Sequence, residues 1–163
     1  MYRSPTKPIL VTGGSGYVGS KLVPMLAQHC KVRTLDSQNF GNAIAGTPNV
    51  EFLQGDIRDI DAVQAAVRGV DTVIHLAGIV TDELVDMNEN YATAVNLHAI
   101  GLLCWEAMHA GVERFIYASS SSVYGSQLGE CVEGTLPQPQ TAYARQKLAG
   151  EELLGKDKDK LWV

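Results

Sequence analysis

Short runs of isoleucine, valine and leucine alternate along the chain with longer stretches whose apolar residues recur at helical spacing. This alternation is typical of βαβ units, in which parallel strands are buried on both faces. The strands are predicted near Ile9–Thr12, Val32–Asp36, Val50–Leu53, Val70–Leu76 and Phe115–Ser119, with a possible sixth that begins at Leu161. Helices are predicted at Tyr17–His29, Asp59–Arg68, about Asn90–Ala110 and Tyr143–Leu154. The expected fold class is α/β, with a doubly wound parallel sheet.

Two long segments, Ser37–Asn49 and Ser120–Ala142, are rich in Gly, Ser, Asn, Gln and Pro and are predicted to be loops. Each follows a predicted strand. In an open parallel sheet, the loops that leave the carboxyl ends of the strands border the ligand crevice. We therefore expect any binding site to lie at that edge of the sheet.

Composition supports one folded domain over residues 1–163. The chain of 163 residues is 45% hydrophobic and 19% charged, which excludes disorder as a description of the whole. Its formal charge is −5, from 13 Lys and Arg against 18 Asp and Glu, and the basic residues form no cluster. Nucleic acid is therefore not an expected partner.

The cysteines and histidines suggest neither disulfides nor a metal site. Cys30, Cys104 and Cys131 are an odd, widely spaced set without a CxxC pair, which favours a reducing, cytoplasmic compartment. No stretch approaches the ~18 apolar residues of a membrane span, so no membrane association is expected. His75 lies in a predicted buried strand and is expected to be a hydrogen-bonded core residue. The other histidines lack ligand spacing.

A glycine turn joins the first predicted strand to the first helix in the sequence TGGSGYVG, residues 12–19. In this context Gly13 permits the tight turn, Gly16 lets the backbone approach a pyrophosphate, and Gly19 lets the helix pack on the strand. The N–H groups of the first helical turn, at Tyr17 and Val18, would bind the anion. This arrangement is the dinucleotide-binding signature of the Rossmann type.

An acidic residue follows at the position that reads the ribose. Asp36 ends the second predicted strand, 20 residues beyond Gly16. Its carboxylate can accept hydrogen bonds from both hydroxyls of an adenosine ribose and would repel a 2′-phosphate. NAD is therefore the expected cofactor. Arg33 precedes the acid, but strand alternation places it on a different face.

A second group of polar residues follows the fifth predicted strand. Tyr143 and Lys147, in the sequence YARQK, lie at i and i+4 and hence on one face of a helix. The segment SSSSVYG, residues 119–125, brings hydroxyl groups to the same edge of the sheet as the glycine turn. A phenol, an ammonium group and hydroxyls are thus expected beside the dinucleotide site.

These motifs, together with GDIRD at 55–59 and HLAG at 75–78, resemble the short-chain dehydrogenase/reductase superfamily. Within it, the chain resembles the extended branch of NAD-dependent nucleotide-sugar epimerases and dehydratases, from about Ile9 to Leu154. The resemblance implies that Tyr143 is the catalytic acid/base, that Lys147 favours the phenolate and holds the nicotinamide ribose, and that Ser120 binds the reacting oxygen.

The resemblance also implies further cofactor contacts. Asp56 would accept a hydrogen bond from the adenine amine, with Ile57 packed on the ring. Leu76, Ala77 and Gly78 would pass close to the cofactor, and Gly78 departs mildly from the family, which more often has Ala there. The sequence does not distinguish Asp56 from an ordinary turn aspartate. Asn96 matches a polar residue that the family keeps on the following helix, and the sequence does not distinguish it from an asparagine on a helix surface.

The extended branch continues well beyond the YxxxK helix, whereas 16 residues follow Lys147 here. The expected domain is therefore an incomplete Rossmann domain, truncated after that helix, with the sugar-recognition region absent and with weak or no turnover alone. Trp105 and Met108 lie on a helix through which family members often dimerise, although ordinary core packing would give the same spacing.

The expected function is an NAD-dependent nucleotide-sugar epimerase that acts through a transient keto intermediate, or the cofactor half of one. The serines at 120–122 favour it over a dehydratase, which would need acidic residues in that segment. An NAD-dependent sugar dehydrogenase or reductase and a non-catalytic NAD-binding module remain alternatives. The sequence names neither the sugar nor its nucleotide.

Overall fold

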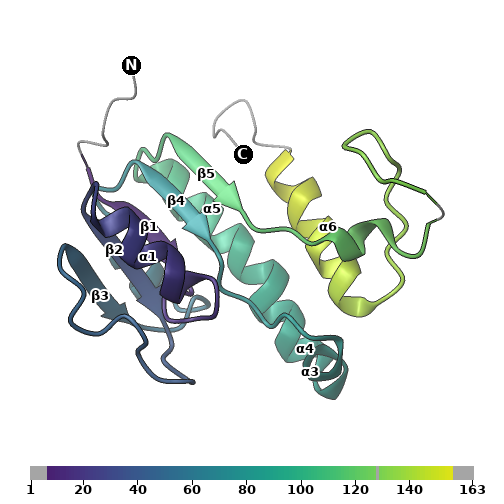
Figure 1. The fold of residues 1–163 in the computed structure, drawn as a ribbon, viewed down its shortest axis with the longest axis horizontal. Helices are drawn as coiled ribbons and strands as arrows, with labels where there is room; N and C mark the ends of the chain where they lie inside the picture. The colour runs from purple at the N-terminus through teal and green to yellow at the C-terminus, as the bar shows by residue number, and fades with distance from the viewer. Residues whose placement is uncertain (1–6, 128, 156–163) are drawn as a thin grey trace.

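Five parallel strands form one sheet in the computed structural model, which describes residues 7–127 and 129–155. The strands are β1 (Ile9–Thr12), β2 (Val32–Asp36), β3 (Val50–Gln54), β4 (Thr72–His75) and β5 (Arg114–Tyr117). Their order is β3-β2-β1-β4-β5, so β2 and β3 are added on one side of the central β1 and β4 and β5 on the other (Figure 1). This order confirms the predicted Rossmann-type doubly wound sheet. The sixth strand predicted at Leu161 lies outside the described residues.

The helices follow the predicted rhythm, with two short additions. They are α1 (Gly19–Ala27), α2 (Ile60–Val67), α3 (Asp82–Met87), α4 (Glu89–Thr93), the π-helix η1 (Ala94–His98), α5 (Ala99–His109), the 3₁₀ helix η2 (Ser121–Tyr124) and α6 (Ala142–Gly155). The single helix predicted over residues 90–110 is three consecutive elements, α4, η1 and α5. Neither α3 nor η2 was expected from the sequence pattern.

Alternation along the strands divides the core between the two faces of the sheet. Leu10, Val73 and Phe115 face α2, α5 and the end of α6 and form the larger apolar cluster. Ile9 and Val11 point the other way and pack with residues of α1. All five side chains are at most 8% exposed, and burying each such side chain contributes roughly 1.5–3 kcal/mol. The strands therefore form because both of their faces are covered.

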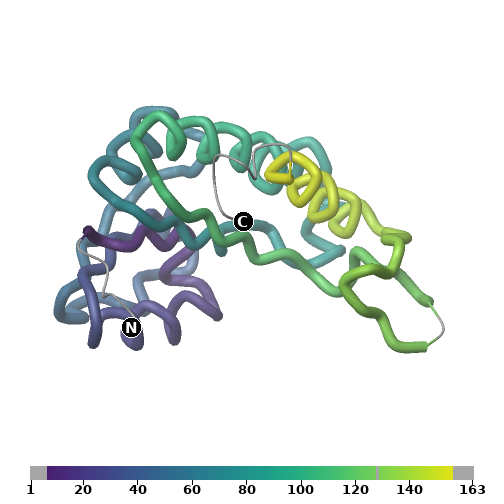
Figure 2. The backbone as a smooth tube through the Cα atoms, turned by 90° about the horizontal axis from the view of Figure 1, so that it is seen from above, coloured from purple at the N-terminus to yellow at the C-terminus, as the bar shows by residue number. Residues whose placement is uncertain are grey.

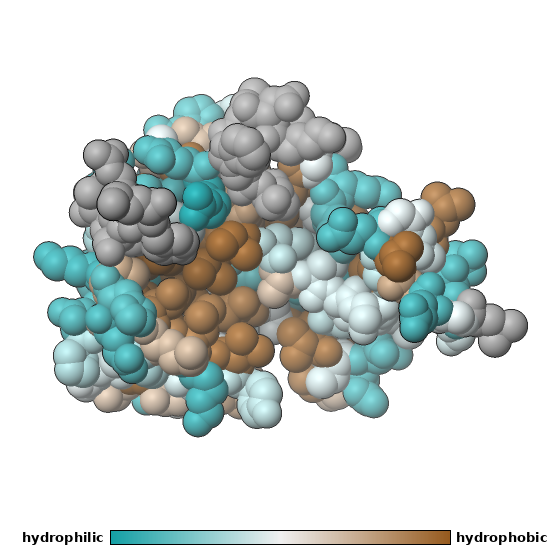
Figure 3. All heavy atoms as spheres, turned by 45° about the horizontal axis from the view of Figure 1, so that its top comes forward, coloured by the Kyte–Doolittle hydropathy of each residue, from teal (hydrophilic) through white to brown (hydrophobic). Residues whose placement is uncertain are grey.

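The two faces of the sheet are covered unequally. On one side α1 packs on β1 and β2, whereas no described helix lies over β4 and β5 on that side (Figure 1). Ile116, which points to that side from β5, is 43% exposed. Figure 3 shows apolar side chains gathered over part of one face of the molecule, bordered by polar groups.

Helix α6 lies alongside α5 and close to the end of β5, as Figure 2 shows for the two helices. Gly150 makes this approach possible: a Cβ atom there would lie 2.7 Å from the Tyr117 hydroxyl and 3.0 Å from Ile100 Cδ1. The loop between η2 and α6 extends away from the sheet (Figure 2). The close packing fixes which residues of α6 reach the carboxyl edge of the sheet.

Helix α5 buries one side and exposes another. Met108 packs partly buried against the larger cluster, whereas Trp105 is 58% exposed and its ring lies 4.3 Å from that of His109. Trp105 is therefore not a core residue, and dimerisation through this helix stays a prediction. Within residues 7–127 and 129–155, every helix is too short or too polar to cross a membrane.

Candidate functional site

The glycine turn after β1 packs directly against the segment that follows β4. Gly13 has φ +72°, and a Cβ atom there would lie 2.7 Å from the backbone nitrogen of Ala77. A Cβ atom at Gly19 would lie 2.6 Å from the carbonyl oxygen of Gly14, so α1 can start so near the strand only with glycine at this position. The predicted reasons for glycine at positions 13 and 19 agree with this geometry.

The two residues just before α1 are exposed to solvent. Tyr17 is 95% exposed and Val18 is 56% exposed. A Cβ atom at Gly16 would meet only the Gly13 carbonyl oxygen, at 3.2 Å, so this side of the turn has room. Because the first N–H groups of a helix have no partner within the helix, an open glycine cradle of this kind fits a pyrophosphate.

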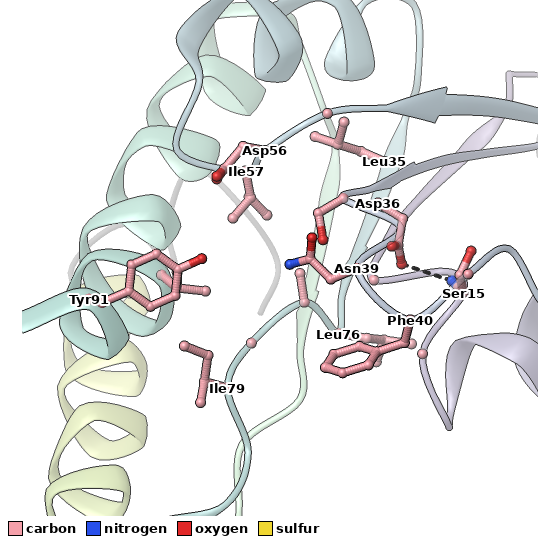
Figure 4. A pocket seen from close by; sticks show the side chains of 18 residues that line it. Ser15, Leu35, Asp36, Asn39, Phe40, Asp56, Ile57, Leu76, Ile79 and Tyr91 are labelled. Atoms are coloured by element: carbon pink, nitrogen blue, oxygen red, sulfur yellow. Dashed lines mark hydrogen bonds between the residues drawn. The ribbon is translucent and has the colours of Figure 1, made fainter. Parts of the chain in front are cut away.

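Asp36 lies at the end of β2 and faces this turn. One of its carboxylate oxygens accepts a hydrogen bond from the backbone N–H of Ser15 at 2.9 Å, and the other accepts one from Gln38 at 2.8 Å. A carboxylate has about four acceptor positions, so both oxygens keep capacity for ribose hydroxyls. The two backbone bonds hold the carboxylate against the glycine turn, as Figure 4 shows for Ser15.

Arg33 points away from Asp36, as strand alternation predicted. Its Nε donates to Glu51 at 2.8 Å, across the β2–β3 pair. Its Nη1 donates to the carbonyl oxygens of Ala66 at 3.0 Å and Arg68 at 2.6 Å, which close the last turn of α2. The guanidinium group is therefore hydrogen-bonded to β3 and to the end of α2, and it does not offset the charge of Asp36.

A pocket opens at the carboxyl edge of the sheet between Asp36 and α4 (Figure 4). Eight of the predicted cofactor residues line it: Gly13, Gly16, Asp36, Asp56, Ile57, Leu76, Ala77 and Gly78. The predicted residues Tyr17, Val18, Gly19 and Lys147 are not part of this lining. The pocket thus brings together eight of the twelve residues predicted to bind the cofactor.

Several lining residues were not predicted. Asn39 and Phe40 come from the loop after β2, and Ile79 and Tyr91 approach from the opposite side (Figure 4). The polar composition of residues 37–49 indicated a loop at the crevice without indicating which side chains line it. Tyr91 carried no signal in the sequence, because its place in the lining depends on the tertiary position of α4.

Asp56 lies in this lining and is held by Arg58. The backbone N–H and the Nε of Arg58 both donate to one carboxylate oxygen at 2.9 Å. These hydrogen bonds lower the pKa of Asp56, so the carboxylate stays ionised. The guanidinium group of Arg58 also lies 4.6 Å from the ring centre of Tyr91. Ile57, beside Asp56, is 7% exposed and gives the pocket an apolar wall.

The second predicted group gathers where α6 meets the end of β5. Lys147 is 6% exposed, and its Nζ donates to the Ala118 carbonyl oxygen at 2.8 Å. The same Nζ lies 4.8 Å from the ring centre of Tyr117 and 5.8 Å from that of Tyr143. Ser120 caps η2 and shares a hydrogen bond of 2.8 Å with the Ser122 hydroxyl. The serine, tyrosine and lysine thus lie together at the carboxyl edge.

Burial dominates the pKa values of this group. Burial raises the pKa of Tyr143, and this effect outweighs the lowering by a hydrogen bond with Ser120. Burial also lowers the pKa of Lys147 to about 8. Lys147 is not among the causes of the shift at Tyr143, which are burial, Ser120 and the charge of Asp82, and its effect on the phenolate stays a prediction.

His75 is a buried core residue, as predicted, with hydrogen bonding on one nitrogen. It is 1% exposed, and its Nδ1 lies 2.7 Å from the Thr12 hydroxyl. Its Nε2 has no hydrogen-bond partner within the described residues. Burial, and then the charge of Lys147, lower the pKa of His75 to about 3, so the ring is neutral. The described residues contain no cluster of three metal-ligating side chains.

The order of the strands, the glycine turn with its acid, and the tyrosine–lysine pair define a dinucleotide-binding domain of the short-chain dehydrogenase/reductase type. Residues 9–157 match the NAD dependent epimerase/dehydratase family, and the chain belongs to that family.

Relatives of this chain carry out different reactions. A 3 beta-hydroxysteroid dehydrogenase/Delta 5-->4-isomerase of Mycobacterium tuberculosis is 39% identical over 120 residues, 71% of this chain and 32% of that protein. A dTDP-D-glucose 4,6-dehydratase of Mus musculus is 32% identical over 157 residues, 89% of this chain and 44% of that protein. The chain thus spans about a third to a half of the length of these relatives.

A solved structure shares the fold. The UDP-glucose 4-epimerase of Thermus thermophilus, in complex with NAD, is 30% identical and superposes with a TM-score of 0.85. The match covers 93% of this chain and 51% of that one. The chain therefore shares the fold of this epimerase over nearly all of its length.

Proposed function

We propose that this chain binds NAD at the carboxyl edge of its sheet and serves an enzyme that inverts a hydroxyl group of a nucleotide sugar. The observation that carries the proposal is the meeting of two groups at one edge: the glycine turn with Asp36, and Tyr143 with Lys147. The first group suits a dinucleotide and the second suits proton transfer. NAD-dependent oxidation and reduction of one carbon needs both.

The choice of NAD over NADP follows from charge. The Asp36 carboxylate faces the glycine turn, where it can accept ribose hydroxyls and would repel a 2′-phosphate. Arg33, the nearest cation in the strand, is bonded to Glu51 and to the end of α2. No cation in β2 is therefore directed toward the site of a 2′-phosphate.

The roles of the chain's own groups follow from their positions. The Tyr143 phenolate would take the proton from the sugar hydroxyl and return it when the keto intermediate is reduced, and Ser120 would donate a hydrogen bond to the reacting oxygen. Lys147 would bind the nicotinamide ribose and, while protonated, favour the phenolate. NAD, when bound, would supply the hydride acceptor and donor that oxidation and reduction of the sugar carbon require. Since burial raises the pKa of Tyr143, the cationic nicotinamide ring is expected to contribute to its deprotonation.

Inversion is favoured over dehydration by the segment after β5. Residues 119–122 are all serines, and a dehydratase would need acidic groups there to expel water. A dehydrogenase is the second candidate, because a relative 39% identical to the chain is named a 3 beta-hydroxysteroid dehydrogenase/isomerase. The two reactions differ in their redox balance. An epimerase consumes no added NAD, whereas a dehydrogenase reduces it in proportion to product.

The experiment compares the wild-type chain with Tyr143→Phe. We call the pocket between Asp36 and α4 the adenosine pocket, because we propose that it holds the adenosine half of NAD. Calorimetry with NAD should give closely similar affinities for both chains, since the change removes one hydroxyl outside this pocket. Incubation with UDP- and dTDP-sugars, followed by NMR, should give no more than slow formation of an epimer with the wild type and none with Tyr143→Phe, without net change in nicotinamide absorbance. Absence of NAD binding by the folded wild type would refute the proposal. Activity retained by Tyr143→Phe would refute the role of the tyrosine.

A further inference from the structure

A buried row of side-chain amides connects the segment after β4 to α6. Asn96, in η1, accepts a hydrogen bond from the backbone N–H of Ile79 at 2.8 Å and donates to the Ile79 carbonyl oxygen at 2.9 Å. It also donates to Gln146 of α6 at 2.9 Å, and Gln146 donates to the Thr93 hydroxyl of α4 at 3.0 Å. Asn96 is 3% exposed and Gln146 is 6% exposed.

The backbone of Ile79 fixes the direction of these hydrogen bonds. Its N–H can only donate, so the oxygen of the Asn96 amide must face it and the NH₂ group must face the carbonyl oxygen and Gln146. Gln146 must then present its oxygen to Asn96 and its NH₂ group to Thr93. One orientation of each amide satisfies all the bonds, and the row is therefore a rigid link in a buried site.

The two ends of this row belong to different halves of the site. Ile79 lines the adenosine pocket and, like Tyr143, packs against the small apolar cluster of Val85, Ala92 and Ala142. Gln146 is the residue before Lys147, and it follows Tyr143 by three positions on the same helix. Glycine at position 78 also suits the link, because a Cβ atom there would lie 3.1 Å from Asn96 Oδ1.

We propose that Gln146 is a positioning residue that sets α6, with Tyr143 and Lys147, against the cofactor segment through Asn96. The proposal rests on the NAD binding proposed above. Replacing Gln146 releases α6 while the two bonds between Asn96 and Ile79 remain, so the adenosine pocket keeps its shape. The nicotinamide half, which depends on Lys147, loses its alignment. The effect should therefore fall on NAD and spare ADP.

The experiment measures ADP and NAD affinities by calorimetry for the wild-type chain, Gln146→Leu and the matched control Gln64→Leu, which alters an exposed glutamine of α2. Losing buried hydrogen bonds of this kind should weaken NAD binding about tenfold in Gln146→Leu and leave ADP within roughly twofold. The control should change neither affinity. Equal losses of both ligands, or no change in NAD binding, would overturn the positioning role.

A milder pair of variants covers the case in which Gln146→Leu does not fold. Thr93→Val removes the acceptor of the last bond at nearly constant volume, and Thr93→Ser keeps it. NAD affinity should fall in the first and recover in the second. Failure of the serine variant to restore NAD affinity contradicts the proposal.

Hydrogen exchange separates this proposal from the proposed function. Wild type that binds neither ligand refutes the NAD function, and exchange at residues 143–147 then decides the positioning role. Faster exchange there in the Thr93→Val or Gln146→Leu chain, with β1 and β4 unchanged, supports the link. Unchanged exchange overturns it.

Discussion

Gly13 and Gly69 have the same φ angle and different surroundings. Both have φ +72°, in the left-handed region that side chains rarely adopt. A Cβ atom at Gly13 would lie 2.7 Å and 2.8 Å from backbone atoms of Ala77, whereas a Cβ atom at Gly69 would meet nothing within 4 Å. Gly13→Ala and Gly69→Ala therefore form a matched pair in which the contact with the backbone after β4 is the difference.

The magnitude follows from two separate effects. Holding alanine in the left-handed region costs about 1–2 kcal/mol, and this applies to both variants. The change in unfolded-chain entropy is also common to both. Overlap with immovable backbone adds the cost of overpacking, about 1–3 kcal/mol, at Gly13 alone. Gly13→Ala should thus lower the free energy of unfolding by about 1–3 kcal/mol more than Gly69→Ala.

Urea unfolding monitored by circular dichroism measures this difference, provided that the two variants have equal m-values. NAD titration gives a second comparison, in which Gly13→Ala should weaken binding and Gly69→Ala should not, since Gly69 follows α2 far from the turn. Equal free energies of unfolding for the two variants would show that the glycine turn can shift away from Ala77. The close packing of the turn on β4 would then not be the reason for glycine at this position.

Two further predictions concern charged groups. Asp36→Asn should weaken NAD binding by about 2 kcal/mol, roughly thirtyfold, because a charged acceptor of two ribose hydroxyls is lost. Calorimetry checks this against Asp61→Asn on the exposed side of α2, and an unchanged NAD affinity would contradict it. Lys147→Met should raise the free energy of unfolding at pH 7. Burial lowers the pKa of Lys147 to about 8, so the unfolded chain binds more protons than the folded one between about pH 8 and its ordinary value of 10.5. The gain should shrink as pH rises through that window in urea titrations, and a gain independent of pH would exclude this cause.

Much of the fold could be predicted from the sequence because its signals are local. The bounds of β1 and β2 agree with the predicted ranges, and α2 and α6 differ from theirs by one residue at each end. The predicted β4 was too long, because residues 70, 71 and 76 lie outside the ladder. Helix α3 was missed because its six residues, capped by Thr81, are too few to show a period.

The candidate site was predictable where spacing alone carries the chemistry. The glycines and Asp36 follow from one strand, one turn and a fixed separation along the chain. Tyr91 and Phe40 line the pocket through tertiary folding that no spacing encodes. The expected effect of Lys147 on Tyr143 also depends on burial, which the one-turn spacing of the two residues does not reveal.

The π-helix η1 makes this region tolerant of a change in chain length at one point. A π-turn closes bonds from i to i+5 and so holds one residue more than the α-turns around it. Because the extra residue is taken up within that turn, deleting one residue between Ala94 and His98 would leave α4 and α5 in nearly the same relative rotation. Tyr91 would keep its place on the wall of the pocket. The same turn carries Asn96, so such a deletion would disturb the bonds from Asn96 to Ile79 and Gln146 rather than the pocket wall.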